Sequence, residues 1–138
     1  MKRLLAALVA LFVFAAPVSA AGSISVNEPG PYHHFDTVTL TVVVPKLKGY
    51  QYPVVLIRCS NDSEVLWTYF RRWDDKGYPP EESGPEPVVL GGDPGNASIR
   101  WNAVGGAADC TIELYAYGGL NHPNPRLLTS APDIHVEP

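Results

Sequence analysis

The chain carries little charge of either sign and few sulfur-containing residues. Charged residues are 17% of its 138 residues, with 14 acids against 10 bases, and there are two cysteines and one methionine. The resulting net charge of −4 lacks the basic footprint with which proteins bind nucleic acid or an anionic membrane surface. We therefore expect no nucleic-acid partner.

A long apolar run is missing everywhere except at the start of the chain. There, Lys2 and Arg3 precede the uncharged stretch 4–16, and small residues follow it. This order is typical of a cleaved secretory signal peptide, and the run is short for a membrane-spanning helix, which needs about 20 residues. We predict a signal peptide at 1–20 and one secreted domain at 21–138, with no membrane span after cleavage.

Sustained helical periodicity is absent as well. The chain is divided by 14 prolines and 12 glycines, and its apolar residues tend to recur at every second position. This alternation, typical of strands with one buried face, is clearest in 36–44 and 108–117. The expected buried faces are Val38, Leu40, Val42 and Val44 in the first stretch and Cys110, Ile112, Leu114 and Ala116 in the second.

Shorter or less regular strands fill the rest of the chain. We predict them at 23–28, 51–59, 64–73, 87–90, 97–102 and 126–136. The proline-rich and acidic stretch 74–87 is predicted to be a surface loop. Short strands separated by turns about every ten residues favour an all-β fold of the sandwich type.

The two cysteines are expected to join two neighbouring core strands. Cys59 ends the apolar run 54–59, and Cys110 begins the second alternating stretch. Cysteines of an exported protein usually pair, so we favour a Cys59–Cys110 disulfide over two free thiols. Such a bridge sets an antiparallel register in which apolar residues face each other, Ile57 opposite Ile112 and Val55 opposite Leu114.

The whole pattern resembles the immunoglobulin-like superfamily. The resemblance rests on the alternating strand 38–44, on Cys59 at a strand end, on Trp101, and on the run 109–115 around Cys110. It implies an Ig-like antiparallel β-sandwich of seven to nine strands with one disulfide, similar to modules of bacterial secreted and surface proteins. In antibody domains the bridge crosses between the sheets, whereas here we expect it within one sheet. Modules of this kind serve as adhesive, spacer or partner-binding units, and the resemblance implies such a role by analogy alone.

A cluster of aromatic residues is the best candidate for a binding surface. It comprises Trp67, Tyr69, Phe70, Trp73 and Tyr78. Tyr, Trp and Arg are enriched at binding hot spots, since the aromatic side chains bury a large area with little loss of entropy. We predict that Trp73, Tyr78 and Arg72 are partly exposed and form a recognition patch together with Arg71. The structural alternative is that one face of 64–73 belongs to the core.

Catalytic and metal-binding patterns are weak. The adjacent His33 and His34 would point to opposite faces of a strand, and no cysteine or third histidine lies at ligand spacing. The acids of 74–87 supply oxygen ligands for calcium, or an acid–base pair for glycoside cleavage, but their spacing matches no known loop. No nucleophile elbow, phosphate loop or zinc motif is present. We predict no metal site, no cofactor and no enzyme activity, and leave calcium binding by the acidic loop open.

The expected function is non-catalytic recognition or adhesion outside the cytoplasm. An extracellular protein partner is favoured over a carbohydrate. One alternative is a structural spacer without a ligand, which would bury all five aromatic residues under a polar surface. The other is a small secreted glycan hydrolase, which would need carboxylates converging in a cleft. The identity of the partner and the oligomeric state do not follow from the sequence.

Overall fold

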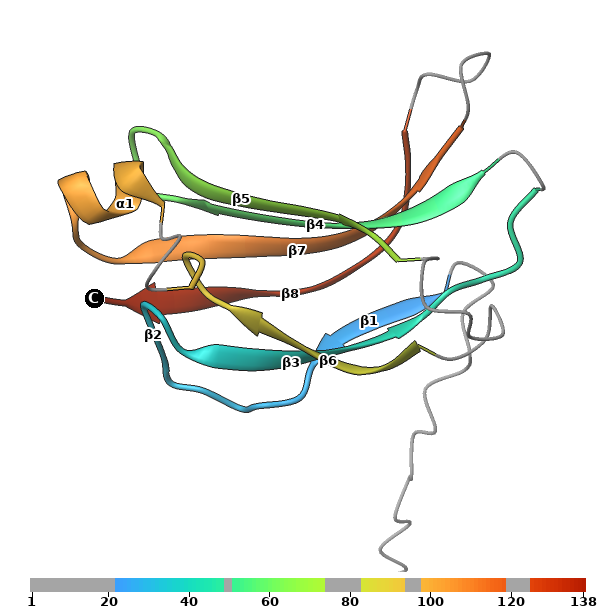
Figure 1. The fold of residues 1–138 in the computed structure, drawn as a ribbon, viewed down its shortest axis with the longest axis horizontal. Helices are drawn as coiled ribbons and strands as arrows, with labels where there is room; N and C mark the ends of the chain where they lie inside the picture. Colours follow the sequence, from blue (N-terminus) through green and yellow to red (C-terminus); the bar gives the residue numbers. More distant parts are fainter. Residues whose placement is uncertain (1–21, 49–50, 74–82, 94–97, 119–124) are drawn as a thin grey trace, which may run out of the picture.

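A computed structural model describes residues 22–48, 51–73, 83–93, 98–118 and 125–138 of the chain. In chain order, the elements are β1 (Ser23–Val26), β2 (Tyr32–His33), β3 (Thr37–Val43), β4 (Tyr52–Ser60), β5 (Val65–Arg72), β6 (Ser83–Val89), α1 (Ile99–Val104), β7 (Ala108–Tyr117) and β8 (Arg126–Glu137). The strands form a three-stranded sheet in the order β1-β3-β6 and a five-stranded sheet in the order β2-β8-β7-β4-β5 (Figure 1). The described part is therefore all-β apart from one short helix, and the predicted signal peptide at 1–20 lies outside it.

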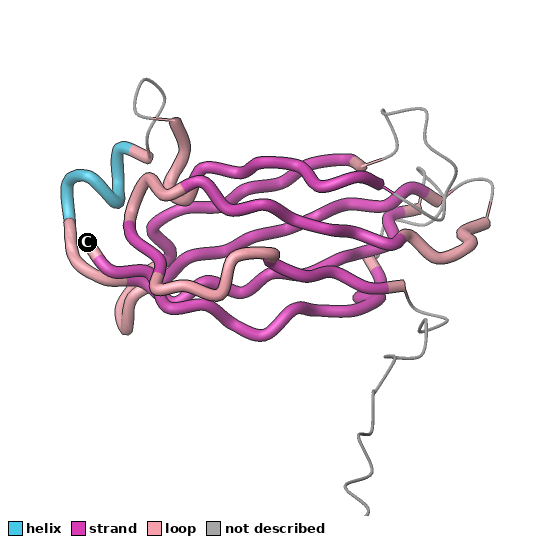
Figure 2. Tube along the Cα trace, turned by 90° about the horizontal axis from the view of Figure 1, so that it is seen from below, coloured by secondary structure: helices cyan, strands magenta, loops and turns pink. Residues whose placement is uncertain are grey.

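The two sheets lie face to face around one hydrophobic core, with α1 at the same end of the molecule as the C-terminus (Figure 2). In β3, the predicted set Val38, Leu40 and Val42 is buried, while the threonines between them reach solvent. In β7, the residues from Cys110 to Ala116 alternate in the same way. The predicted alternation is confirmed in both strands, and the two-layer arrangement is compatible with a β-sandwich.

The pairing of β4 with β7 follows the predicted register. Cys59 lies opposite Cys110, and the two form a disulfide between neighbouring strands of one sheet. The flanking pairs are those expected from the sequence, Ile57 opposite Ile112 and Val55 opposite Leu114. All six side chains are fully buried. The disulfide and its place within one sheet are therefore confirmed.

One strand pair departs from the predicted antiparallel arrangement. The short strand β2, which the sequence pattern did not predict, pairs in parallel with the end of β8, with Tyr32 opposite Val136. Between β1 and β2 the chain turns at Gly30, whose φ of 80° is in the left-handed region that favours glycine. The turn carries the chain from the edge of one sheet to the edge of the other, where it runs in the same direction as β8. The five-stranded sheet is therefore mixed.

The predicted strand over 97–102 is wrong, because α1 occupies most of it. Ser98 caps this helix, and its hydroxyl accepts a hydrogen bond from the backbone N–H of Trp101 at 3.4 Å. Gly105, at φ 67°, ends the helix. Trp101 is fully buried and stacks on the His34 ring, with 4.3 Å between the ring centroids. One buried side chain between two exposed neighbours fits a strand and a single helical turn equally well, so the alternation was misleading.

Strand β6 begins inside the stretch predicted as a surface loop. Within the described ranges it pairs with β3 alone, with Pro87 opposite Thr39. Proline is compatible with this position because β6 lies at the edge of its sheet, where a missing N–H need not break a ladder hydrogen bond. The predicted loop 74–87 therefore extends too far at its C-terminal end, because residues 83–87 belong to β6. The remaining residues 74–82 lie outside the described part.

Candidate functional site

Strand β4 is buried on both faces. Its residues Val55, Ile57 and Cys59 belong to the core between the sheets. Val54 and Leu56 alternate with them and are also buried, at 0% and 9% exposure, although they are not part of that core. A strand that is buried on both faces needs a second apolar layer above it. The outer face of the five-stranded sheet must therefore carry such a layer.

The second layer is an aromatic platform, which we define as Tyr52, Phe70, Tyr115 and Tyr117. Tyr52 comes from β4, Phe70 from β5, and the other two from β7. The ring of Tyr117 contacts all the others, at centroid distances of 5.9 Å to Tyr52, 5.4 Å to Phe70 and 6.3 Å to Tyr115. Aromatic pairs in such arrangements contribute about 0.5–1.5 kcal/mol each beyond the area that they bury. The platform is therefore preorganised by its own contacts.

One cation and one carboxylate lie against the platform. The Arg72 guanidinium is 4.2 Å from the centroid of the Tyr52 ring, a cation–π contact. The Tyr115 hydroxyl donates a hydrogen bond to the Glu113 carboxylate at 2.9 Å. Burial of Tyr115, together with this hydrogen bond, raises the pKa of its hydroxyl group. The phenol is consequently protonated at neutral pH and holds Glu113 in place.

The platform continues into exposed apolar surface. Phe70 is 56% exposed, and Leu127 of the neighbouring strand β8 is 50% exposed. The register places Leu127 opposite Tyr115, so the two lie on the same face. Exposed apolar groups gathered on one face mark interaction sites more often than scattered ones do. We therefore take the platform as the candidate binding surface.

Trp73 does not take part in this surface, and the prediction that it is partly exposed is wrong. It is 4% exposed and belongs to the core between the sheets. Its backbone N–H donates to the Pro53 carbonyl at 3.0 Å, which continues the β4–β5 ladder by one residue. Alternation along β5 then places Trp73 on the same side as Trp67 and Tyr69, which pack against the core. Phe70 takes the opposite, outer side.

Of the three predicted patch residues that the structure describes, Arg71, Arg72 and Trp73, only Arg72 lies at the platform. The Arg71 guanidinium faces inward and forms an ion pair with the carboxylate of Glu86 on β6, which links the two sheets. Glu86 is only 7% exposed, so Arg71 neutralises a charge that is held away from water. Tyr78 lies outside the described residues. Two adjacent arginines thus have different roles. Arg71 stabilises the packing of the two sheets, and Arg72 lies on the outer surface.

Replacing Arg71 by alanine is expected to destabilise the fold by about 2 kcal/mol. Loss of one partner of a buried ion pair typically costs about 3–5 kcal/mol, and we expect less here because the Arg71 side chain is 40% exposed. Arg72→Ala is the matched control, since it removes the same side chain from the outer face. Urea denaturation of both variants measures the difference, and equal stabilities for the two would contradict the inward role of Arg71.

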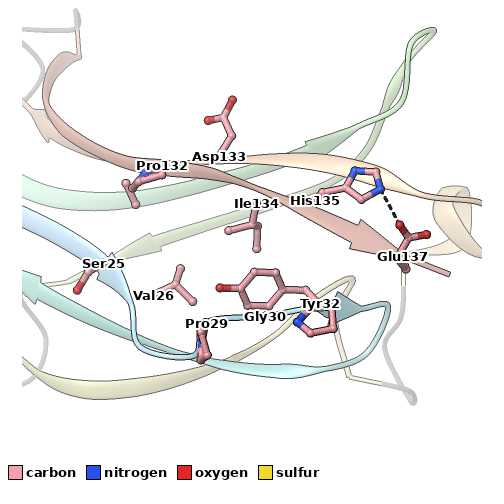
Figure 3. Close-up of a pocket in the computed structure, with 12 residues that line it drawn as sticks. Ser25, Val26, Pro29, Gly30, Tyr32, Pro132, Asp133, Ile134, His135 and Glu137 are labelled. Atoms are coloured by element: carbon pink, nitrogen blue, oxygen red, sulfur yellow. Dashed lines mark hydrogen bonds and ion pairs between the residues drawn. The ribbon is translucent and has the colours of Figure 1, made fainter.

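A concave surface, separate from the platform, lies between the end of β1 and β8 (Figure 3). Its volume is about 490 Å³. The apolar part of the lining comprises Val26, Ala131, Ile134, the Tyr32 ring and three prolines, Pro29, Pro31 and Pro132. Asp133, His135 and Glu137 supply its ionisable groups. We call this surface the groove.

Two ionisable groups of the groove, His135 and Glu137, contact each other, and His135 also contacts Asp109 outside the lining. His135 contacts the Asp109 carboxylate through Nδ1 at 2.7 Å and the Glu137 carboxylate through Nε2 at 3.0 Å. The hydrogen bond with Asp109 is the main reason that the pKa of His135 is raised. Figure 3 shows Asp133 directed away from Tyr32, whereas Glu137 points to His135. The two carboxylates that line the groove therefore do not face each other as an acid–base pair would.

The other sequence candidates are not assembled into a site. His33 lies beside Asp36, with 3.5 Å between Nδ1 and Oδ2, and burial lowers the pKa of the stacked His34. Within the described ranges, no group of three or more His, Cys, Asp or Glu residues is placed to hold a metal ion. The acids of 74–82 lie outside those ranges. In the part of the chain that the structure describes, no helix is long and apolar enough to cross a membrane.

Comparisons with protein-family models, with curated proteins and with solved structures returned no match to this chain. Its function is therefore argued from the geometry of the platform and the groove.

Proposed function

We propose that this chain is a secreted, non-catalytic recognition domain of the Ig-like kind, and that the aromatic platform binds an extracellular protein. The observation that carries the proposal is the exposure of Phe70, at 56%, in direct contact with an ordered tyrosine cluster. Binding hot spots combine aromatic residues with arginine, and Arg72 lies against this cluster. The two-layer all-β architecture and the single disulfide are consistent with an Ig-like secreted domain.

The rigidity of the platform supports this role. All four of its rings stand on paired strands of one sheet, so binding immobilises few rotatable bonds. A spacer without a ligand would gain nothing from keeping Phe70 in water, because burying or replacing this ring would reduce exposed apolar area. A glycan hydrolase would need opposed carboxylates, which the groove does not provide among its lining residues.

The test uses the partner captured by wild-type protein from the native extracellular fluid. The binding of this partner to Phe70→Ala is compared with its binding to wild type. We expect Phe70→Ala to weaken binding by about 2 kcal/mol or more, which is roughly 30-fold in Kd, because a truncated hot spot leaves its contact area unfilled. Its stability should change by no more than about 1–2 kcal/mol, since most of the ring is already in water.

The matched control is Ile99→Ala, which removes another exposed apolar side chain, 86% exposed, from α1. We expect this variant to bind as wild type does. If Phe70→Ala binds as wild type does, or if both variants lose the same affinity, the platform is not the binding surface. Protease or glycosidase treatment of the captured material distinguishes a protein partner from a glycan.

A further inference from the structure

The short segment between β2 and β3 joins the two sheets at the end of the molecule that carries α1 (Figure 1). On one side, the His34 N–H donates to the Glu137 carbonyl of β8 at 2.8 Å. On the other, the Phe35 N–H donates to the Leu90 carbonyl, and the Leu90 N–H donates to the Asp36 carbonyl, both at 2.9 Å. Leu90 directly follows β6, so the segment connects the five-stranded sheet with the three-stranded one. We call His34, Phe35 and Asp36 the clasp.

The ring of His34 is central to the clasp. It stacks on two other rings, with 4.0 Å to the centroid of Phe35 and 4.3 Å to that of the fully buried Trp101. Phe35 has a φ of 72°, and a residue with a side chain is strained in this left-handed region. Such strain persists only where the surrounding structure maintains it. The His34 stack and the bonds to both sheets therefore keep the clasp in its conformation.

The inner nitrogen of the His34 ring has no acceptor for a proton. Nε2 is inaccessible to solvent and has no hydrogen-bond partner among the described residues. It faces the backbone of Gly91, where an added Cβ atom would lie only 2.3 Å from Nε2. A neutral imidazole fits this place with its proton on Nδ1, whereas an imidazolium carries protons on both nitrogens. The charged form would therefore bury an N–H group without a partner, which is unfavourable.

Charged side chains stand on the elements around His34, and none of those described bonds its Nε2. They are Asp36 of the clasp and His33 of β2, which contact each other, Glu137 of β8, which contacts His135, Arg100 of α1, which pairs with Glu64, and Asp93, which follows the turn at Gly91. The first of these contacts lies within one segment and ties it to neither sheet. Burial lowers the pKa of His34, and no neighbouring carboxylate offsets this effect.

A second histidine at this end of the molecule responds to acid in the opposite direction. The two ring nitrogens of His135 contact the carboxylates of Asp109 on β7 and Glu137 on β8, and only the charged ring donates to both. These contacts, that with Asp109 foremost, raise the pKa of His135. Acid therefore keeps the end of β8 attached to β7 while it weakens the packing of His34. A conformational change in acid is directed to the clasp.

We propose that the clasp is an acid-sensitive switch, in which uptake of a proton by His34 releases its ring from the stack and separates β2 and the clasp from the rest of the molecule. In the open form the imidazolium reaches water, so protonation and opening favour each other. Because the pKa of His34 is lowered in the closed form, the clasp is fully closed above the ordinary value of about 6.5 and opens as the pH falls through the lower value. The platform residues of β7 lie at the other end of that strand, so the switch does not depend on the platform.

The test is amide hydrogen exchange of the full domain, followed by two-dimensional NMR between about pH 7.5 and pH 5. Protection factors, which correct for the intrinsic effect of pH on exchange, are compared for His34, Phe35 and Leu90. Below about pH 6.5 they should fall by up to about tenfold per pH unit, because opening is coupled to one proton. Ile57 of the central strand β4 should remain at least about tenfold better protected at every pH, which shows that the opening is local. Constant protection of the clasp, or protection equal to that of Ile57, contradicts the proposal.

Two variants identify the group that titrates. His34→Gln removes the titratable ring from the stack, and His33→Gln is the matched control on the exposed neighbour. We expect the protection of Phe35 and Leu90 in His34→Gln to vary less than about twofold with pH, whereas His33→Gln responds as wild type does. A response that persists in His34→Gln, or is lost in His33→Gln, overturns the assignment to His34.

A second measurement needs no variant. The ring signals of the histidines are titrated by NMR in wild-type protein, alongside the amide exchange. His34 should titrate below about pH 6.5 and below His135, because its charged form is disfavoured in the closed clasp. A His34 ring that titrates at or above about pH 6.5, or above His135, would show that the clasp accepts the charged ring and would overturn the switch.

Discussion

A variant with alanine in place of both Cys59 and Cys110 is expected to lose about 4 kcal/mol of unfolding free energy. The two residues are 51 positions apart, and closing a loop of that length removes a corresponding amount of entropy from the unfolded chain. Against a typical stability of about 5–15 kcal/mol, this is a large share. Chemical denaturation of the variant and of wild type gives the difference directly.

The control for this prediction is wild-type protein with the bridge reduced, which keeps both sulfur atoms in the core. Reduction should cause most of the loss, and the double alanine variant should lose slightly more because it also shortens two fully buried side chains. Peptide mapping without reductant should recover the linked cysteines. Equal stability of the oxidised and reduced protein would show that the bridge does not hold the two strands in the way described.

Trp73→Ala is expected to be the most damaging single substitution on β5 and its continuation, at about 3–5 kcal/mol, because it leaves a cavity where a nearly buried indole packs against the core. Phe70→Ala, three residues earlier and on the opposite face, should cost much less stability and lose binding instead. Thermal denaturation and partner binding are measured on both variants. If Trp73→Ala remains stable but binds the partner less tightly, then Trp73 belongs to the recognition surface and its burial is contradicted.

The disulfide and the platform depend on the same pair of strands. The register that brings Cys59 opposite Cys110 also places Tyr52 opposite Tyr117 and Val54 opposite Tyr115. A shift of this register by one residue would turn every side chain to the wrong face. The bridge therefore fixes the arrangement of three platform tyrosines, and loss of the bridge is expected to loosen the binding surface as well as the fold.

Much of the fold could be predicted from the sequence because its central strands obey a simple period. In β3 and β7 one face is buried and the other is wet, so apolar and polar residues alternate. The register of β4 with β7 followed from matching Cys59 to Cys110. The elements that could not be predicted are too short or too irregular to show a period. A two-residue strand such as β2 has no pattern of its own, and six helical residues in α1 do not complete two turns.

The candidate site was harder to predict because its members come from three strands. Phe70 belongs to the predicted aromatic cluster and Arg72 to the predicted patch, but Tyr52, Tyr115 and Tyr117 join them only through the register of the sheet. A signal was present in the unbroken apolar run 54–57, which indicates a strand buried on both faces and hence a cover on the outer one. Nearness in sequence to the other aromatic residues instead favoured Trp73. Trp73 follows β5 directly, and the alternation of the strand turns its side chain toward the core.

The most direct test of the account is hydroxyl-radical footprinting of the domain alone and bound to its captured partner. Aromatic side chains react readily, so Phe70 and Tyr117 report on the platform, and Tyr32 reports on the groove within the same sample. We predict that binding lowers the modification of Phe70 and Tyr117 and leaves that of Tyr32 unchanged. Protection of Tyr32 with undiminished modification of Phe70 and Tyr117 would contradict the platform as the binding surface.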